Sequence, residues 1–159
     1  MEQRPTYGAG FALDITLGTM LETPIYLHQK PDAELVDVRQ SEPCRVVLIS
    51  ECSTPQALKD SIAKELVHGS CLYLMAWGTE CEAWHDAVDM ANIEKFDFQE
   101  IPEEQFIMTT WHDNEPLVEA FWFCKNNATH STAEFRHTVL LHVSPEAREQ
   151  QVLAQYAGA

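Results

Sequence analysis

Two cysteines, a histidine and an aspartate are the residue types from which a nucleophilic active site could be built. They are Cys52, Cys81, His112 and Asp113. A thiol beside an imidazole, with a carboxylate orienting the ring, is the arrangement of a base-activated nucleophile. However, His112 and Asp113 are adjacent, and adjacent side chains of an extended segment point in different directions. Nearby carboxylates would also raise the pKa of a thiol, whereas helix N-termini would lower it. Thiol catalysis is therefore one hypothesis, and buried cysteines without a catalytic role are the other.

The same residue types could also ligate zinc. Cys81 and His85 are four positions apart, which places two ligands on one face of a helix. Cys52 and His112 are acceptable further ligands, but they would have to converge from different segments. Because no compact ligand motif is present, we expect neither a metal ion nor another cofactor.

A set of polar and aromatic residues could line a site for a small ligand. They are Glu51, Trp77, Thr79, Glu80, Trp111 and Ser144. The turns around Glu51 and Glu80 lack the glycines that let a backbone enclose a pyrophosphate, and no P-loop or G-x-G-x-x-G motif occurs. The two carboxylates would repel a phosphate, whereas a neutral or cationic ligand could stack on a tryptophan.

Four apolar segments predict the strands that would position these residues. They span residues 45–50, 71–77, 105–111 and 138–143, and continuous apolar runs of this kind are typical of strands covered on both faces. A helix is predicted after each strand: residues 55–68, residues 80–95, a segment from after 114 to about 127, and residues 145–156. Start signals support these helices, namely a hydroxyl residue before proline at 53–55 and 144–145, and a capping box at 79–82.

This alternation predicts an α/β fold. We expect a three-layer sandwich in which helices cover both faces of a mostly parallel, four-stranded sheet. With the strands numbered along the chain, the expected order is 2-1-3-4, as in flavodoxin-like sheets of the Rossmann-like type. The carboxyl ends of parallel strands meet along one edge, where we expect residues 50–52, 77–81, 111–113 and 142–144 to come together.

The 159 residues are expected to form a single domain. Residues 45–159 hold the repeated β/α units, and residues 1–44 form an N-terminal extension without an intervening linker. Within this extension, residues 23–28 are typical of an additional edge strand. Residues 11–21 are compatible with a strand or a short helix, and residues 32–39 with a loop.

The charge excludes several classes of function. There are 25 Asp and Glu residues against 10 Lys and Arg, so the formal net charge is −15. Such a chain repels phosphate backbones, and we expect no direct binding of nucleic acid.

The longest apolar run, residues 71–77, is far below the roughly 20 residues that span a bilayer, so no membrane association is expected. Five cysteines without a C-x-x-C pair indicate reduced thiols in the cytoplasm.

Three segments carry a resemblance to a known group of proteins. They span residues 72–78, 84–97 and 106–112. Over residues 45–144 the chain resembles members of an uncharacterised bacterial domain family of unknown function. The resemblance implies a shared α/β domain, and it transfers neither catalytic residues nor an activity.

These observations favour a small acidic cytoplasmic protein that binds a protein partner, of the kind found among immunity and regulatory factors. A basic partner would suit the charge of the chain. The alternative is an enzyme: a hydrolase or a small-ligand site at the carboxyl edge of the sheet that uses Cys52, Cys81, His112 and Asp113. A self-assembling subunit is a third possibility.

Overall fold

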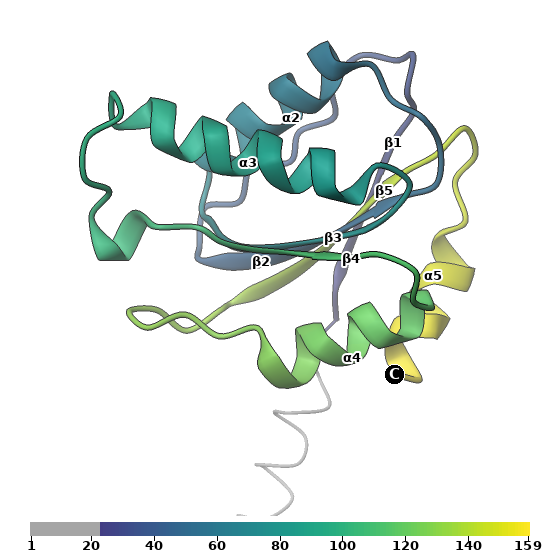
Figure 1. Cartoon of the computed structure of the whole chain (residues 1–159). Helices are drawn as coiled ribbons and strands as arrows, with labels where there is room; N and C mark the ends of the chain where they lie inside the picture. The colour runs from purple at the N-terminus through teal and green to yellow at the C-terminus, as the bar shows by residue number, and fades with distance from the viewer. Residues whose placement is uncertain (1–22) are drawn as a thin grey trace, which may run out of the picture.

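Strands and helices alternate along the chain in the computed structural model, which describes residues 23–159 (Figure 1). The strands are β1 (Ile25–Gln29), β2 (Cys44–Ser50), β3 (Cys71–Gly78), β4 (Met108–His112) and β5 (His137–Val143). The helices are α2 (Gln56–His68), α3 (Cys81–Lys95), α4 (Leu117–Asn127) and α5 (Glu149–Ala157), with a 3-10 turn at Glu103–Gln105. The expectation for residues 11–21 lies outside the described residues.

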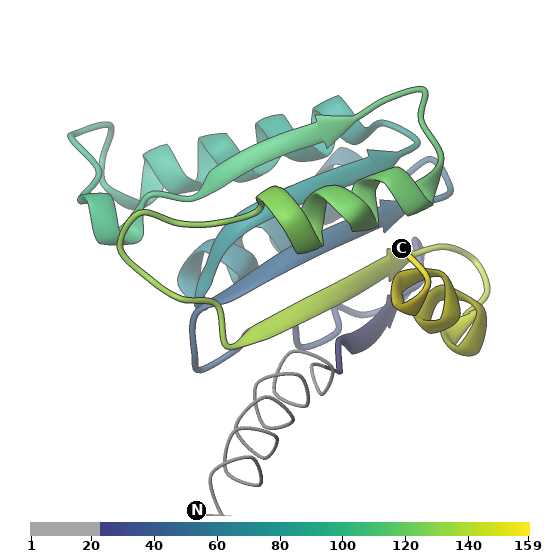
Figure 2. The ribbon, with the colours of Figure 1, turned by 90° about the horizontal axis from the view of Figure 1, so that it is seen from below.

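The strands form one open parallel sheet with helices on both faces. Every strand pairing is parallel, and the order across the sheet is β1-β5-β2-β3-β4. Helices α2 and α3 lie on one face, and α4 and α5 lie on the other (Figures 1 and 2). The predicted α/β sandwich and the additional N-terminal edge strand are therefore confirmed.

The predicted strand number and strand order were wrong. The sheet has five strands, and the chain reverses direction across the sheet after β4, so that β5 inserts between β1 and β2. Burial explains this placement. Residues 139–143 of β5 are fully buried, as a central parallel strand requires, whereas Met108 and Trp111 of β4 are exposed. The polar Thr109 and Thr110 interrupt the apolar pattern of β4, which suits the edge of the sheet.

Side chains that alternate along the strands feed two separate cores. Val46 and Leu48 of β2 pack in the core beneath α2 and α3. Val47 and Ile49 point to the opposite face, into the core with α4 and α5. Each face of the sheet is therefore covered by its own helical layer, and the carboxyl ends of the strands emerge between the layers.

None of the three predicted start signals supplies a side-chain cap. Helix α2 begins after Pro55, and the hydroxyls of Ser53 and Thr54 donate to Glu80 and to the carbonyl of Cys52 instead. Helix α3 begins after Glu80, which has left-handed backbone geometry (φ 58°) and makes no side-chain cap, so the capping box at residues 79–82 is absent. Helix α5 begins only at Glu149, and Ser144 donates its hydroxyl to the carbonyl of Glu146 instead of capping a helix. Strand β4 likewise starts later than predicted, after the 3-10 turn.

Candidate functional site

The carboxyl ends of the strands form one rim, because all strands run in the same direction. The strand order places the residues that follow β5 beside those that follow β2, and the residues that follow β4 lie at the far end. Glu51 and Ser144 line one cavity, whereas Asp113 follows β4. The predicted site residues therefore form separate groups along the rim instead of one pocket.

A cavity of about 450 Å³ lies where β2 and β5 end. It is lined by Glu51, Ser144, Pro145, Glu146, Ala147 and Arg148. The chain leaves β2 toward α2 on one face of the sheet and leaves β5 toward α5 on the other. Open α/β sheets bind ligands at such a reversal point. Sequence reasoning found Glu51 and Ser144 but missed Arg148, because it placed Arg148 inside a helix.

A buried hydrogen-bond network surrounds His142 next to this cavity. The hydroxyl of Tyr26 lies 2.6 Å from Nδ1 of His142, and Oε1 of Glu51 lies 2.6 Å from its Nε2. The backbone N–H of Arg148 donates to the Tyr26 hydroxyl at 3.1 Å, and this hydroxyl donates its own hydrogen to Nδ1, because the proton of the neutral ring lies on Nε2, which faces the carboxylate of Glu51. His142 in turn donates Nε2–H to Glu51, whose carboxylate also accepts hydrogen bonds from the Arg148 guanidinium.

Burial favours the neutral form of His142. Burial lowers the pKa of His142, and the opposing effect of Glu51 does not overcome it. His142 is 0% exposed and both of its ring nitrogens are occupied, so it offers no proton acceptor to a substrate. The Nε of Arg148 is a buried donor without a partner among the described residues. The network therefore ties β1, β2, β5 and the start of α5 together.

Glu80 lies in the tight turn between β3 and α3 and joins two loops. The turn depends on Gly78, which has φ +95° and lies so close to the carbonyl of Ser50 that an added Cβ would be 2.2 Å from its oxygen. The Glu80 carboxylate accepts a hydrogen bond from Thr54 N–H at 3.1 Å and pairs with the buried ammonium of Lys59 at 2.8 Å. The contact with Lys59 is the main reason that the pKa of Glu80 is lowered. Glu80 therefore stabilises the contact between the loop after β2 and the turn after β3.

The two candidate thiols do not contact an imidazole. Burial raises the pKa of Cys52, and the charges of Glu51 and Glu80 raise it further. Burial also raises the pKa of Cys81, and the charge of Asp113 adds to the effect. Both environments favour the protonated thiol, which is the unreactive form. All five cysteines of the chain are free.

His112 instead belongs to a relay of hydroxyl, imidazole and carboxylate. Its Nε2 lies 3.0 Å from the hydroxyl of Thr110, and its Nδ1 lies 2.6 Å from the carboxylate of Glu115. Glu115 therefore takes the position that the sequence assigned to Asp113. The turn after β4 makes this contact possible, because Asn114 adopts a left-handed conformation (φ 59°). The His-x-x-Glu spacing was the signal that could have identified Glu115.

The remaining predicted ligand residues serve different roles. The indole N–H of Trp77 donates to the carbonyl of Glu115 at 2.8 Å, and the backbone N–H of Thr79 donates to the carbonyl of Ser50 at 2.8 Å. Both residues therefore hold turns at the rim. Trp111, in contrast, is 45% exposed and makes an edge-to-face contact with the ring of His85, with 4.6 Å between the ring centroids.

The four residues considered as zinc ligands do not converge. Nδ1 and Nε2 of His85 contact the carboxylates of Asp86 and Asp89, at 3.0 and 3.3 Å. Within residues 23–159, no group of three or more His, Cys, Asp or Glu side chains is placed to hold a metal ion. Over the same range, no helix combines the length and the apolar character needed to cross a membrane.

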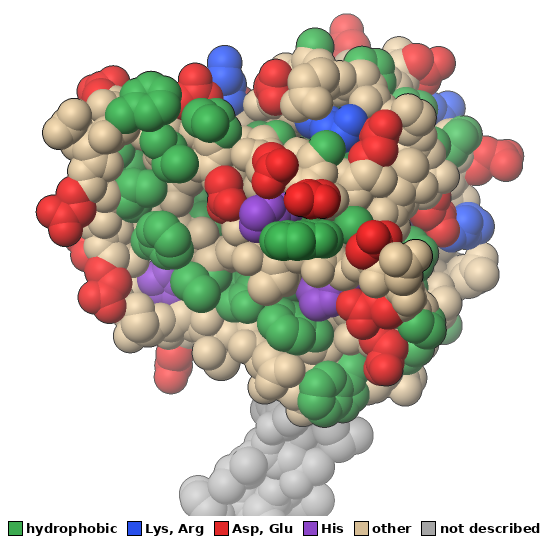
Figure 3. Space-filling model, viewed as in Figure 1, with side chains coloured by type: hydrophobic (Ala, Val, Ile, Leu, Met, Phe, Trp, Pro, Cys, Tyr) green, Lys and Arg blue, Asp and Glu red, His purple; other side chains and the backbone are tan. Residues whose placement is uncertain are grey.

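Exposed hydrophobic side chains gather around the edge strand β4. Nine large ones are exposed in the described part of the chain, and all except Leu35 fall between residues 90 and 122. These eight are Met90, Ile93, Phe98, Phe106, Met108, Trp111, Val118 and Trp122. Figure 3 shows hydrophobic side chains across the face between α3 and α4, with Asp and Glu among them. We call the exposed side chains of Phe106, Met108 and Trp111 the β4-edge face.

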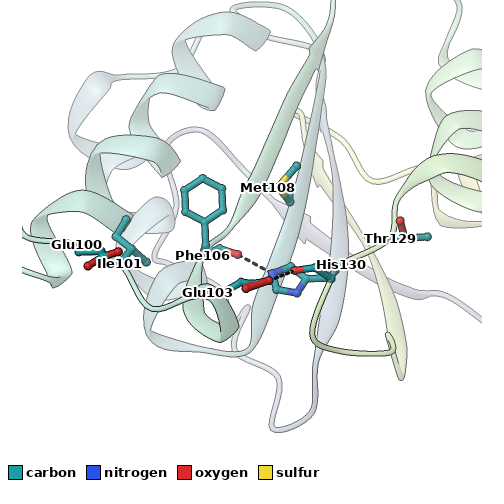
Figure 4. A pocket seen from close by; sticks show the side chains of 8 residues that line it. Glu100, Ile101, Glu103, Phe106, Met108, Thr129 and His130 are labelled. Atoms are coloured by element: carbon teal, nitrogen blue, oxygen red, sulfur yellow. Dashed lines mark hydrogen bonds between the residues drawn. The ribbon is translucent and has the colours of Figure 1, made fainter.

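A cavity of about 490 Å³ lies at the amino end of β4 (Figure 4). It is lined by Glu100, Ile101, Glu103, Phe106, Met108, Thr129, His130 and Ser131. The loop after α4 closes one side of it: His130 Nε2–H donates to the carbonyl of Phe106 at 2.8 Å, and the hydroxyl of Ser131 donates to Glu103 at 2.9 Å. This lining suits an apolar group with a positive charge beside it.

Negative charge surrounds the β4-edge face. Between Lys95 and Lys125 the sequence has seven Asp and Glu residues and no Lys or Arg. The seven are Asp97, Glu100, Glu103, Glu104, Asp113, Glu115 and Glu119. Helix α3 adds Asp86 and Asp89, which hold His85 against Trp111. A positively charged surface would therefore be attracted to this face.

Comparison with known proteins assigns the chain to a family. Residues 24–159 match the model of a domain of unknown function, DUF7684. The chain belongs to this family. The match includes β1 and therefore extends the DUF7684 domain beyond the region in which the sequence itself carried the resemblance. No curated protein and no solved structure matches the DUF7684 chain.

Proposed function

We propose that this chain acts by binding a positively charged protein partner through the β4-edge face. The observation that carries this proposal is the concentration of exposed hydrophobic side chains at one edge of the sheet. The neighbouring sequence, between Lys95 and Lys125, has Asp and Glu but no Lys or Arg. Contiguous apolar surface is costly to expose to water, and in a folded protein it commonly marks a site of association.

The residue types also favour a protein partner. Tryptophan, phenylalanine and methionine are enriched at the centres of protein interfaces, and truncated tryptophans are frequent hot spots. Trp111, Phe106 and Met108 provide these types, and each is more than 40% exposed. The surrounding carboxylates would accelerate encounter with a basic protein and discriminate against acidic ones.

A regulatory or immunity-type role in the cytoplasm agrees with this mode of action. Such proteins act by occupying a partner and need no catalytic centre of their own. The five free cysteines support a reducing compartment, because disulfides are rare in the cytoplasm.

Affinity capture tests the proposal. The full chain is immobilised and exposed to an extract of the source cells at low ionic strength, and the retained proteins are identified. We expect a partner with an isoelectric point above about 9, which is released when salt rises from about 50 to about 300 mM because screening weakens charge attraction.

A double variant and a matched control locate the interaction. Met108→Ser with Trp111→Ser removes apolar surface from the β4-edge face and should lose the partner. Leu35→Ser removes a large exposed hydrophobic side chain that lies outside residues 90–122, and this variant should still bind the partner. Retention of the same proteins by the double variant, or release that does not depend on salt, would overturn the proposal.

The relay at His112 supports a second candidate function, a hydrolase. Thr110, His112 and Glu115 have the hydrogen-bond order of a base-activated hydroxyl nucleophile. In this role His112 would accept the hydroxyl proton as Thr110 attacks an acyl carbon, and Glu115 would stabilise the imidazolium. His112 would then give the proton to the leaving alcohol as its bond to the acyl carbon breaks, and water would release the acid from Thr110 in the same way. The group replaces the predicted set of Cys52, Cys81, His112 and Asp113 as the candidate catalytic residues.

Hydrolysis of an activated ester, p-nitrophenyl acetate, tests this second candidate. Turnover should be lost in Thr110→Ala and kept in Thr109→Ala, because the hydroxyl of Thr109 donates to Asp89 and lies outside the relay. Equal rates for both variants would exclude Thr110 as the nucleophile.

A further inference from the structure

We infer that the partner supplies an extended, basic segment that pairs with the free edge of β4 as a sixth strand and places an apolar side chain in the cavity at the amino end of β4. This inference rests on the proposed function and adds the mode of binding. The segment would be about five residues long, the length of β4 and of a common strand.

The backbone of β4 has one unpaired edge. β4 pairs with β3 along one side in an unbroken register from Met108 to His112, and no other described strand lies beside it. Figure 2 shows β4 as the outermost strand of the sheet. Its free N–H and C=O groups form a template for another strand.

β4 lacks three features that natural proteins use to block a sheet edge. Lysine, proline and bulges are the common ones, and residues 108–112 contain none of them. One carbonyl is already occupied, because His130 donates to Phe106 just before the strand. Pairing would therefore begin near Met108, next to the cavity.

Charge decides which occupant fits the edge. Seven acidic residues and no Lys or Arg lie between Lys95 and Lys125. A second copy of the chain would place two such acidic surfaces against each other, which disfavours a dimer formed through β4. An extended segment with Lys or Arg beside an apolar residue would instead neutralise Glu100 and Glu103 while its apolar side chain contacts Phe106 and Met108.

Defined synthetic peptides test the inference on the full chain. The probe is a nine-residue peptide that alternates lysine with valine and has phenylalanine at the centre, and the comparison peptide has glutamate in place of lysine. Nuclear magnetic resonance titration should show that the basic peptide shifts the backbone amides of residues 108–111, whereas the acidic peptide does not bind.

Two N-methylated versions of the basic peptide separate strand pairing from simple charge attraction. One carries methyl groups on the odd backbone nitrogens and the other on the even ones, so both keep the same side chains and charge. A strand added to one edge uses alternate N–H groups, so one version should bind about tenfold more weakly than the other.

Three results would overturn the inference. They are equal affinities of the two methylated peptides, shifts confined to residues away from β4, and no binding of the basic peptide at millimolar concentration. The first would leave the proposed function standing, because a basic ligand would still bind at the β4-edge face. The proposed function itself fails only in the capture experiment, so the two failures can be distinguished.

Discussion

The ends of β2 and β5 and the outer edge of β4 are both rich in polar and aromatic groups, but they use them differently. Around His142, hydrogen bonds at distances near 2.6 Å join the side chains of Tyr26, Glu51 and Arg148, and the Nε of Arg148 lacks a partner among the described residues. At β4, Trp111 and Met108 remain exposed and one backbone edge is unpaired. Buried polar groups that are paired internally hold a fold together, whereas exposed apolar groups at an open edge favour association.

This difference teaches that residue type alone does not locate function on this sheet. A histidine, a glutamate and an arginine at the point where the chain reverses direction form the group that a search for catalysis would select first. Their hydrogen bonds show that they join strands. The residues Met108 and Trp111, which expose hydrophobic surface, belong to an edge strand and include no catalytic residue type.

Replacing Gly78 should give the largest loss of stability, because Gly78 lies against the backbone of Ser50 at the end of β2. In Gly78→Ala the new Cβ would lie 2.2 Å from the carbonyl oxygen of Ser50, in a backbone conformation that alanine rarely adopts. We expect a loss of about 3 kcal/mol or more of unfolding free energy, measured by urea denaturation. Gly158→Ala is the control, since its Cβ would make only ordinary contacts. Equal stability of the two variants would contradict the account.

Glu51→Ala should come next, because it leaves His142 and Arg148 without their shared carboxylate. We expect a loss of about 2 kcal/mol in the same assay, since removing one partner of a partly buried ion pair leaves the other uncompensated. Glu65→Ala provides the matched control: it breaks the ion pair with Arg39, which lies on the surface, and should have no measurable effect on stability. A stable Glu51→Ala protein would show that the network does not hold the strands.

Trp111→Ser, unlike the two preceding variants, should weaken partner binding and leave the stability of the fold almost unchanged. Stability should change by no more than about 0.5 kcal/mol, as for most surface positions. Affinity for the captured partner should fall at least about tenfold, because an exposed tryptophan is a typical hot spot. Isothermal titration calorimetry with the purified partner measures the affinity. The idea fails if the variant unfolds more easily but binds as tightly as the wild type.

The smallest effect concerns pH and comes from His142. Burial lowers the pKa of His142 in the folded state below its unfolded value of about 6.5, so the unfolded chain takes up the proton first. Its contribution is complete above about pH 6.5 and is lost as the pH falls toward the folded-state pKa, by at most about 1.4 kcal/mol per pH unit. The pKa of Glu80 is lowered from an ordinary carboxyl value, so Glu80 acts below this window.

Urea denaturation between pH 5 and pH 7 measures this dependence. His142→Gln removes the titrating group and should give a flatter profile than the wild type. An unchanged slope would mean that another group causes the pH dependence.

The sequence predicted the elements well and their arrangement less well. Apolar runs and helix signals located the four β/α units, and Thr23–Pro24 marked the start of the additional edge strand. Strand order depends on which apolar runs are buried on both faces, and the amino-acid sequence did distinguish these runs. The uninterrupted run of β5 fits a central strand, and the threonines of β4 fit an edge strand.

The candidate site was harder to predict because hydrogen-bond partners come from distant segments. Glu51 meets Arg148 and His142 across more than 90 residues, and no local spacing encodes such a contact. The turn that brings Glu115 to His112 requires a left-handed Asn114, which also cannot be derived from periodicity. The excess of acidic residues was evident from the sequence. That these residues lie beside exposed apolar side chains could be recognised only once the strand order placed β4 at the edge of the sheet.

Hydrogen exchange of the full chain, free and bound to the captured partner, tests the central claim most directly. The account predicts that the β4 amides that point to the free edge, and therefore do not donate to β3, exchange quickly in the free protein and become protected in the complex, while amides of residues 139–143 are protected in both states. Protection gained around Glu51 and Arg148, with the exchange of β4 unchanged, would contradict it.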